Sequence, residues 1–298
     1  MQIDVHADDY GLTPNTSKAI LEGINAGKLS STSVMPNMET FSQSVLYWKE
    51  NLKKDVTPML SVHLNFMEGQ CISPKEKLPH LVDEKGLFFI SWGDLVKYNF
   101  NPFVRRQVKE ELKREIIAQT QRVADAYSIN LQSQLRLDSH QHTHMIPIVL
   151  EAVVDAVREE NWRVSYIRIS REAIVPYLGA MSLWGSHEFI NFIKVVVLNT
   201  FAVWDKKLFK QLGMPEMLLS GVFFSGKMSL ERVQHILPGL KKLARRRNCN
   251  LEILFHPGTV SPDEMGDEFN HPGANEFYLS KGRKMEYEAM MQLDLSCE

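Results

Sequence analysis

The stretch "QIDVHADDYGLTPNTSKAI", residues 2–20, joins a short apolar strand pattern to two adjacent carboxylates and the start of an amphipathic helix. Asp8 and Asp9 stand where the apolar segment ends. Two neighbouring carboxylates in such a place lose water and repel each other, so they need a cation, a proton or hydrogen-bond donors nearby. The stretch therefore predicts a strand followed by a helix, with a functional site at the end of the strand.

This strand–helix unit recurs along the chain. Short β-type runs alternate with helix-length segments, which is typical of parallel strands joined by helical crossovers. No low-complexity linker or charge block divides the 298 residues. We expect one α/β domain over residues 1–298, a barrel of about seven strands and helices, with an open doubly wound sheet as the alternative. The candidate strands lie near residues 2–7, 31–36, 59–65, 134–140, 164–170, 218–225 and 251–257.

Three segments between the strands carry helix signals. Residues 15–28 open with capping-type residues, and Pro147 stands at a natural helix start. The run "FINFIKVVVLNTFAVW", Phe189 to Trp204, is shorter than the ~20 residues of a membrane span and contains Lys194. We interpret this run, part of an apolar insert that starts at His187, as a helix buried in the monomer. An interfacial helix, a wider pocket for a lipid-linked substrate and a dimer contact are the alternatives.

Composition excludes several classes of protein. A hydrophobic content of 44% is too high for a disordered chain, and a net charge of -2 does not indicate a nucleic-acid or membrane-surface binder. We therefore expect a small-molecule partner. Cys71, Cys249 and Cys297 are odd in number and form no CxxC motif, which argues against a disulfide framework and a thiolate zinc site. A reducing cytoplasm fits this pattern, and the N-terminus shows no signal peptide.

Ionisable side chains gather at the ends of four of the seven predicted strands. A parallel sheet or barrel brings the C-terminal ends of its strands to one face, so these groups are expected to meet there. In an extended segment the histidines of "HQHTH" would point to one side, and at least one could face the third strand. The side chains concerned are Asp8 and Asp9 after the first strand, His63 on the third, Asp138, His140, His142 and His144 at the fourth, and His256 after the seventh.

One carboxylate and two imidazoles with open positions for water suit a divalent metal used in catalysis, typically zinc or another first-row ion. Such an ion would also account for the acidic pair. One aspartate of the pair would bind the ion, and its neighbour would accept a proton from the polarised water.

Each of these groups also has a structural interpretation. Asp8 and Asp9 could begin a turn and cap the next helix, and His63 could be an ordinary core histidine. His144 could form hydrogen bonds in the loop before the next helix, and His256 could be a turn residue. Four further histidines have no partner motif and are expected to be ordinary side chains: His6, His80, His187 and His235.

Several motifs carry a resemblance to a known family. They are "HADDYGLTPNTSKAILEGINAGKLSSTSVMPN" at 6–37, "SVHLNF" at 61–66, "LDSHQHTHMIP" at 137–147, "LFHPG" at 254–258 and "SKGRKMEYEAM" at 280–290. In order and spacing the sequence resembles the YdjC family of carbohydrate deacetylases over nearly the whole chain. The family is similar in fold to the polysaccharide deacetylases, so the resemblance implies a distorted (β/α)7 TIM-like barrel.

The resemblance also implies roles for individual residues. Asp9, His63 and His140 would be metal ligands, Asp8 the general base, and His256 the general acid or an orienting group. The sequence departs from the usual family pattern where His6 replaces Asn, Tyr10 replaces Phe, and Gln141 and Thr143 interrupt the histidines. None of these departures removes a proposed ligand.

The function implied is hydrolysis of the N-acetyl group of an amino sugar, chitooligosaccharide-like or another acetylated carbohydrate, with magnesium or zinc as cofactor. Two other functions stay open. A metal-dependent phosphoesterase would use similar Asp and His clusters, and Arg168 is the obvious strand-end cation for its phosphate. A non-catalytic sugar-binding homologue could keep the fold. No nucleic acid or membrane span is expected, and a homodimer is possible.

Overall fold

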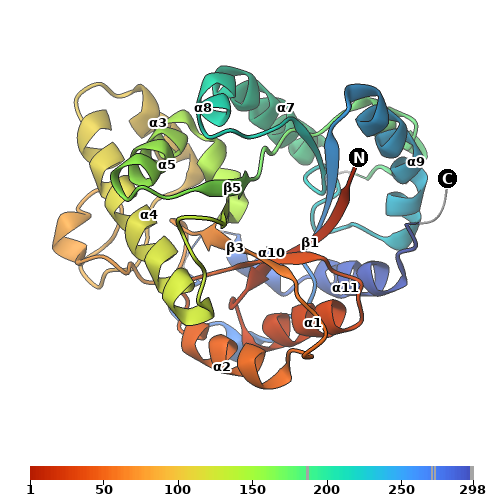
Figure 1. The fold of residues 1–298 in the computed structure, drawn as a ribbon, viewed down its shortest axis with the longest axis horizontal. Coiled ribbons are helices and arrows are strands. Elements are labelled where there is room, and N and C mark those ends of the chain that lie inside the picture. The colour runs from red at the N-terminus through yellow and green to blue at the C-terminus, as the bar shows by residue number, and fades with distance from the viewer. Residues whose placement is uncertain (186–187, 270, 272, 296–298) are drawn as a thin grey trace.

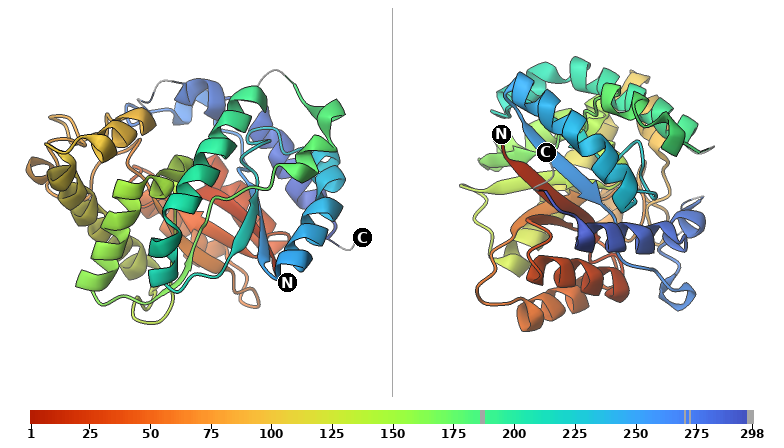
Figure 2. Two further views of the ribbon diagram at one scale, coloured as in Figure 1. Left: turned by 90° about the horizontal axis from the view of Figure 1, so that it is seen from above. Right: turned by 90° about the vertical axis from the view of Figure 1, so that its right-hand side faces the viewer.

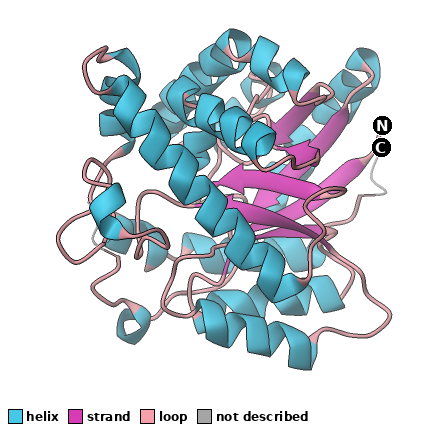
Figure 3. Cartoon of the chain, turned by 60° about the vertical axis from the view of Figure 1, so that its left-hand side comes forward, coloured by secondary structure: helices cyan, strands magenta, loops and turns pink. Residues whose placement is uncertain are grey.

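Seven parallel strands form the sheet at the centre of the protein, in the order β5-β4-β3-β2-β1-β7-β6 (Figures 1 and 3). The computed structural model describes residues 1–185, 188–269, 271 and 273–295. All seven predicted strands are confirmed within a few residues. They are β1 (Ile3–Tyr10), β2 (Ser31–Val34), β3 (Met59–Leu64), β4 (Leu135–Ser139), β5 (Val164–Ile167), β6 (Met217–Ser220) and β7 (Asn250–Phe255).

Helices surround this sheet (Figure 3). In Figure 1, α1 and α2 lie below the sheet, α3, α4 and α5 lie to its left, and α9 lies to its right. The α-helices are α1 (Pro14–Asn25), α2 (Phe41–Asn51), α3 (Trp92–Phe100), α4 (Arg105–Tyr127), α5 (Pro147–Glu159), α6 (Val175–Leu178), α7 (Glu188–Trp204), α8 (Lys206–Gln211), α9 (Leu230–Arg247), α10 (Ala274–Tyr278) and α11 (Gly282–Gln292). The short 3-10 helices among the described residues are η1 (Lys75–Lys77), η2 (His140–Met145), η3 (Met181–Leu183) and η4 (Pro262–Glu264).

Local sequence explains where the crossover helices begin. The Thr13 side chain accepts a hydrogen bond from the backbone N–H of Thr16, and Pro14 occupies the first turn of α1. Pro147 likewise begins α5, as predicted. Buried apolar residues such as Ile20 of α1 and Ile116 of α4 belong to the main hydrophobic cluster, which packs the helices onto the sheet. Cys71 and Cys249 are free thiols, as the sequence indicated, whereas Cys297 lies outside the described residues.

The sheet is curved into a half-barrel, and polar contacts cross its concave side. Tyr166 of β5 and Arg168, just after β5, both contact Glu252 of β7, although β5 and β7 are far apart in the strand order. Beyond β5, Glu172 forms an isolated parallel bridge with Leu219 of β6. The two edge strands therefore approach each other through the segment that follows β5.

Glu172 joins the segment after β5 to the segment after β6. Its carboxylate accepts hydrogen bonds from the backbone N–H groups of Gly221, at 2.8 Å, and Phe223, at 2.7 Å, and from the Tyr177 hydroxyl. Burial raises the pKa of Glu172 to about 7, against the opposing effect of these donors. The Glu172 side chain is fully buried and makes all of these contacts, so it helps to hold the segments after β5 and β6 together.

We expect Glu172→Ala to lower the free energy of unfolding by roughly 2–4 kcal/mol, because it leaves buried N–H donors without an acceptor. Urea denaturation of the variant measures the loss. Glu216→Ala, which removes an exposed glutamate next to β6, is the matched control and should change stability by less than about 0.5 kcal/mol. Equal stability of the two variants would show that the Glu172 contacts contribute nothing.

Helix α7 corrects the expectation that the apolar run is buried. The run is helical, and Val195, Leu198 and Phe201 are buried, but its opposite face is exposed. The exposed apolar residues of the helix are Phe189, Ile190, Ile193, Val196, Val203 and Trp204. The expectation failed because the helix is apolar on all sides, and periodicity cannot then show which side is covered. His187 lies outside the described residues. Among the described residues, no helix is both long enough and apolar enough to cross a bilayer.

Candidate active site

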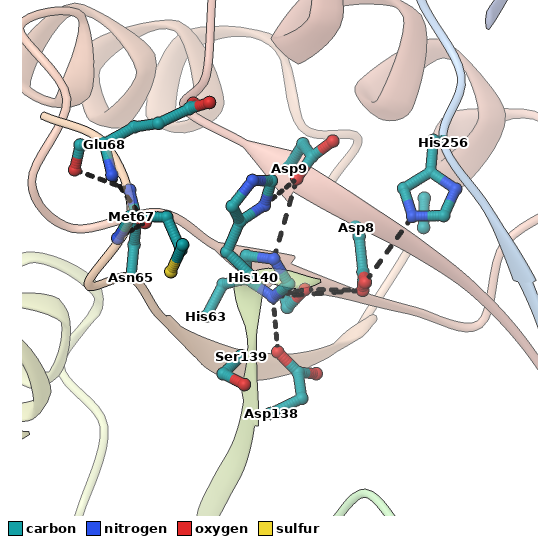
Figure 4. Close-up of polar contacts among 12 residues, drawn as sticks. Asp8, Asp9, His63, Asn65, Met67, Glu68, Asp138, Ser139, His140 and His256 are labelled. Carbon is teal, nitrogen blue, oxygen red and sulfur yellow. Dashed lines mark hydrogen bonds and ion pairs between the residues drawn. The ribbon is translucent and has the colours of Figure 1, made fainter. Parts of the chain in front are cut away.

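An irregularity at the end of β1 brings both acidic side chains to the site. In a regular strand, adjacent side chains point to opposite faces. The register between β1 and β2 shifts between Ala7 and Tyr10, and Asp9 adopts a left-handed backbone with φ of 75°. This bulge turns Asp9 toward the side on which Asp8 already lies (Figure 4). Its backbone conformation is uncommon outside glycine, and such conformations cluster at functional sites.

Asp9, His63 and His140 converge on one point from three different strand ends (Figure 4). Asp9 Oδ1 lies 3.6 Å from His63 Nε2 and 3.4 Å from His140 Nδ1. His63 is on β3, and His140 begins η2 directly after β4. The structure therefore brings together the three side chains that the sequence predicted as metal ligands.

The opposite ring nitrogens of both histidines are held by other side chains. His63 Nδ1 lies 2.6 Å from Asp138 Oδ1, which fixes the proton on Nδ1 and leaves a lone pair on Nε2. His140 Nε2 lies 3.1 Å from the Tyr278 hydroxyl, which itself donates to Glu68 at 2.8 Å. The Nδ1 lone pair of His140 is then the one that faces Asp9. Outer contacts of this kind orient the histidine ligands of metal sites.

These atoms fit a divalent cation. Asp9 Oδ1 and His63 Nε2 are buried and have no hydrogen-bond partner among the described residues. Acceptor atoms that face one another in this way need a positive charge between them. Ligand atoms roughly 2 Å from a tetrahedral ion stand about 3.3 Å apart, close to the distances found here. Arg283 donates a 2.9 Å hydrogen bond to the other oxygen of Asp9, Oδ2, which holds Asp9 as a carboxylate.

The "HQHTH" segment is not extended, which corrects the expectation that its histidines share one side. It forms η2, with Gln141 and His142 in left-handed conformations at φ of 52° and 57°. His144 turns away from the three-residue cluster and bonds the Ser139 hydroxyl and the Arg168 carbonyl, as its alternative interpretation predicted. His142 instead lines the pocket described below.

Asp8 is held as a carboxylate by a buried guanidinium. Arg168 donates two hydrogen bonds of 2.8 Å to the two oxygens of Asp8, and Ser33 donates a third of 2.9 Å. Burial would raise the pKa of Asp8, but the Arg168 charge and nearby imidazoles bring it well below its usual value. His6 was expected to be ordinary and instead joins this group, with Nε2 3.1 Å from Asp8 Oδ1 and 3.6 Å from Asp138 Oδ2.

His256 follows β7 and approaches Asp8 from the other side (Figure 4). Its Nε2 lies 3.9 Å from Asp8 Oδ2, and its Nδ1 lies 3.4 Å from Glu286 Oε2. Glu286 also accepts a 2.6 Å hydrogen bond from the His256 backbone N–H. Burial lowers the pKa of His256, but Glu286 and the two aspartates outweigh it, so the pKa is raised. The imidazolium form, which can donate a proton, is thereby favoured.

We expect Glu286→Gln to shift the alkaline limb of the pH–rate profile to lower pH. If His256 is the general acid that the resemblance implies, it must be protonated, so activity should fall as pH rises through its pKa. The carboxylate of Glu286 raises the pKa of His256, and the neutral amide removes that effect while keeping an acceptor for the backbone N–H. Profiles of kcat/KM for both proteins check this. An alkaline limb at the same pH in the variant would contradict the role of Glu286.

A cavity of about 460 Å³ opens beside these residues, a size typical of small-ligand sites. Asp8, His140 and His256 form part of its wall, and Lys194 is its one lysine or arginine among the described residues. Apolar side chains from α3 and α7 and from the segments around β6 and α10 line another part of it: Trp92, Ile193, Val197, Leu198, Val222 and Phe277.

Sequence reasoning missed most residues that support the site. Arg168 was considered only as a phosphate ligand, and Glu252, which accepts from Arg168 Nε at 2.8 Å, was not considered. Arg283, Glu286 and Tyr278 come from the C-terminal part of the chain. The resemblance of residues 280–290 to the final helix of the family was the signal that could have identified Arg283 and Glu286.

Comparison with known proteins identifies the family of this chain. The model of the family described as YdjC-like protein matches residues 2–296. The chain belongs to the YdjC family. A solved structure from Enterococcus faecalis V583, provisionally titled a cellobiose-phosphate cleavage protein, superposes on this YdjC-family chain with a TM-score of 0.59 at 20% identity, which shows a similar fold. That superposition covers 98% of this chain and 95% of the other.

Curated relatives of this YdjC-family chain are named carbohydrate deacetylase. The Clostridium beijerinckii protein is 28% identical over 56% of this chain and 61% of its own length. The Brevibacillus brevis protein is 30% identical over 56% of this chain and 59% of its own length. The chain therefore spans about three fifths of these two relatives. The Xenopus laevis protein is 22% identical over 99% of this chain and 92% of its own length.

Proposed function

We propose that the protein is a metal-dependent hydrolase that removes the acetyl group from an N-acetylated amino sugar. The observation that carries the proposal is the convergence of Asp9, His63 and His140, with unpartnered buried acceptor atoms, beside Asp8 and His256. Membership of the YdjC family and relatives named carbohydrate deacetylase support the reaction class.

Asp9 Oδ1, His63 Nε2 and His140 Nδ1 would hold a divalent ion, magnesium or zinc. When bound, such an ion polarises water and the acetyl carbonyl and stabilises developing negative charge on oxygen. Two imidazoles favour zinc among these metals, and a carboxylate suits either. Asp138 and Tyr278 hold the two imidazoles so that their lone pairs face the ion.

Asp8 and His256 would move the protons. Amides are poor electrophiles and amines are poor leaving groups, so hydrolysis needs a base for the water and an acid for the departing nitrogen. Arg168 keeps Asp8 ionised, so its Oδ2 can accept the proton of the attacking water. His256 Nε2, 3.9 Å from that oxygen, would protonate the nitrogen as the C–N bond breaks. Glu286 favours the imidazolium that this step requires.

For the fold, we propose that residues 1–298 form one domain whose half-barrel is a distorted (β/α)7 TIM-like barrel. The contacts of Tyr166 and Arg168 with Glu252 support closure across the concave side. The bridge between Glu172 and Leu219 supports closure at the edges.

The phosphoesterase alternative is not favoured, because its proposed phosphate ligand is occupied. Arg168 is fully buried and its guanidinium bonds Asp8 and Glu252, with Asp138 Oδ2 at 3.3 Å. A phosphate would have to displace these carboxylates, which costs the contacts of a buried ion pair. A purely sugar-binding role is also not favoured, since it requires neither the acid nor the base.

Release of amine from N,N′-diacetylchitobiose tests the proposal. We expect turnover that disappears when metal is stripped and returns when magnesium or zinc is restored. An aryl phosphate assayed in parallel should not be hydrolysed. Metal-bound protein that releases no amine from this sugar or from other N-acetylated sugars, but hydrolyses the phosphate, would reverse the assignment.

A further inference from the structure

The exposed face of α7 continues directly into the cavity. Phe189 is 70% exposed and Ile190 57%, although both are large apolar side chains on one helix. Ile193, one turn further along, is 48% exposed and also lines the cavity. Figure 2 shows α7, in teal, at the outside of the molecule with no described element over it in the view from above. A contiguous exposed apolar patch of this kind typically marks a site that binds a ligand or a partner.

The cavity wall beside α7 is poorly suited to a sugar. Ile193, Val197 and Leu198 of α7 line the cavity together with Val222, and none of these side chains carries a hydrogen-bonding group. Sugar hydroxyls placed against this wall would lose water without gaining a partner. The same cavity also presents the polar side chains of Asp8, His140 and His256. The cavity therefore offers polar groups for an acetylated sugar and an apolar wall for hydrocarbon.

Lys194 adds a positive charge at the same wall. It lines the cavity, and the described residues offer it no ion pair. Although the residue is exposed overall, its ammonium loses enough water for burial to lower its pKa. By charge complementarity, this ammonium would favour a ligand that carries an anionic group.

We propose that the substrate is an amphiphile, an N-acetylated sugar joined to a hydrocarbon chain, and that the chain runs from the cavity over Ile193 onto the exposed face of α7. This inference rests on the proposed function and specifies its substrate class. Continuity between the cavity and the helix face points to the substrate's own chain as the occupant, because Val197, Leu198 and Ile193 line the cavity and Ile193 is also exposed on that face.

The test compares the methyl and octyl β-glycosides of N,N′-diacetylchitobiose, each below its critical micelle concentration. We expect kcat/KM to be at least about tenfold higher for the octyl glycoside, because several methylenes leave water. Ile193→Asn should reduce this preference to about twofold or less, and Ile193→Ala should reduce it partly. Val203→Asn is the matched control, because Val203 lies 64% exposed on the same helix but outside the cavity wall.

Calorimetric binding of the two glycosides measures the same preference without turnover. Equal affinity and equal kcat/KM for both glycosides in the unmodified protein would overturn the inference. So would an octyl preference that Val203→Asn and Ile193→Asn weaken equally. If the protein is a dimer in sedimentation experiments and Ile193→Asn dissociates it, the exposed face of α7 is a dimer interface. That result would also overturn the inference. An octyl preference in binding with no amine released would support the apolar site and contradict the proposed function alone.

Discussion

Replacing Asp8 by Asn should lower kcat by roughly 10²–10⁴-fold while leaving metal content unchanged, because the amide cannot accept the proton of the attacking water. Asn has the shape of Asp, and Arg168 keeps Glu252 and Asp138 as partners, so the fold should persist. The variant also leaves the Asp9 carboxylate in place as a ligand. Steady-state amine release from an N-acetylated sugar, with metal analysis of the same sample, measures both quantities.

Asp4→Asn is the matched control for this variant. Asp4 lies near the start of the same strand and bonds Ser30 and Ser31 instead of the site residues. Its substitution should leave kcat within about twofold of the unmodified protein. Turnover of Asp8→Asn near the normal rate would show that another group takes the proton. Loss of metal from Asp8→Asn would show that Asp8 is itself a ligand.

The second large effect is expected from His63→Ala. Removing a ligand from a site with three protein ligands should weaken metal binding by more than the 10–100-fold typical of losing an outer contact. It also leaves Asp138 without its 2.6 Å partner. Metal analysis after gel filtration and titration with zinc and magnesium measure the loss, and activity should fall in parallel at limiting metal.

The variant His142→Ala tests whether a histidine close to the proposed metal ligands is itself needed for metal binding. His142 comes from the same segment as His140 but bonds Ser170 through Nδ1, at 2.9 Å, and lines the cavity. This variant should keep the metal affinity of the unmodified protein. The ligand assignment is wrong if His63→Ala retains metal normally, or if His142→Ala loses it to the same extent.

The strands and their order along the chain could be read from local pattern. Periods of two residues and short apolar runs depend only on neighbours in sequence, so all seven predicted strands are found. Helix starts at Pro14 and Pro147 follow from the fixed φ of proline, another local property. The exposure of α7 could not be predicted in this way, because its apolar residues occupy every side of the helix.

The sequence alone determined which strand ends carry ionisable groups. It also determined that these groups gather on one face, because parallel strands bring their C-terminal ends together. Tertiary structure decided what each group does there. Arg168 reaches Asp8 across 160 positions of sequence, and Arg283 reaches Asp9 across 274. Partners so distant leave no local pattern, because burial, hydrogen bonding and the resulting pKa values arise only when the sheet curves and brings them within a few ångströms.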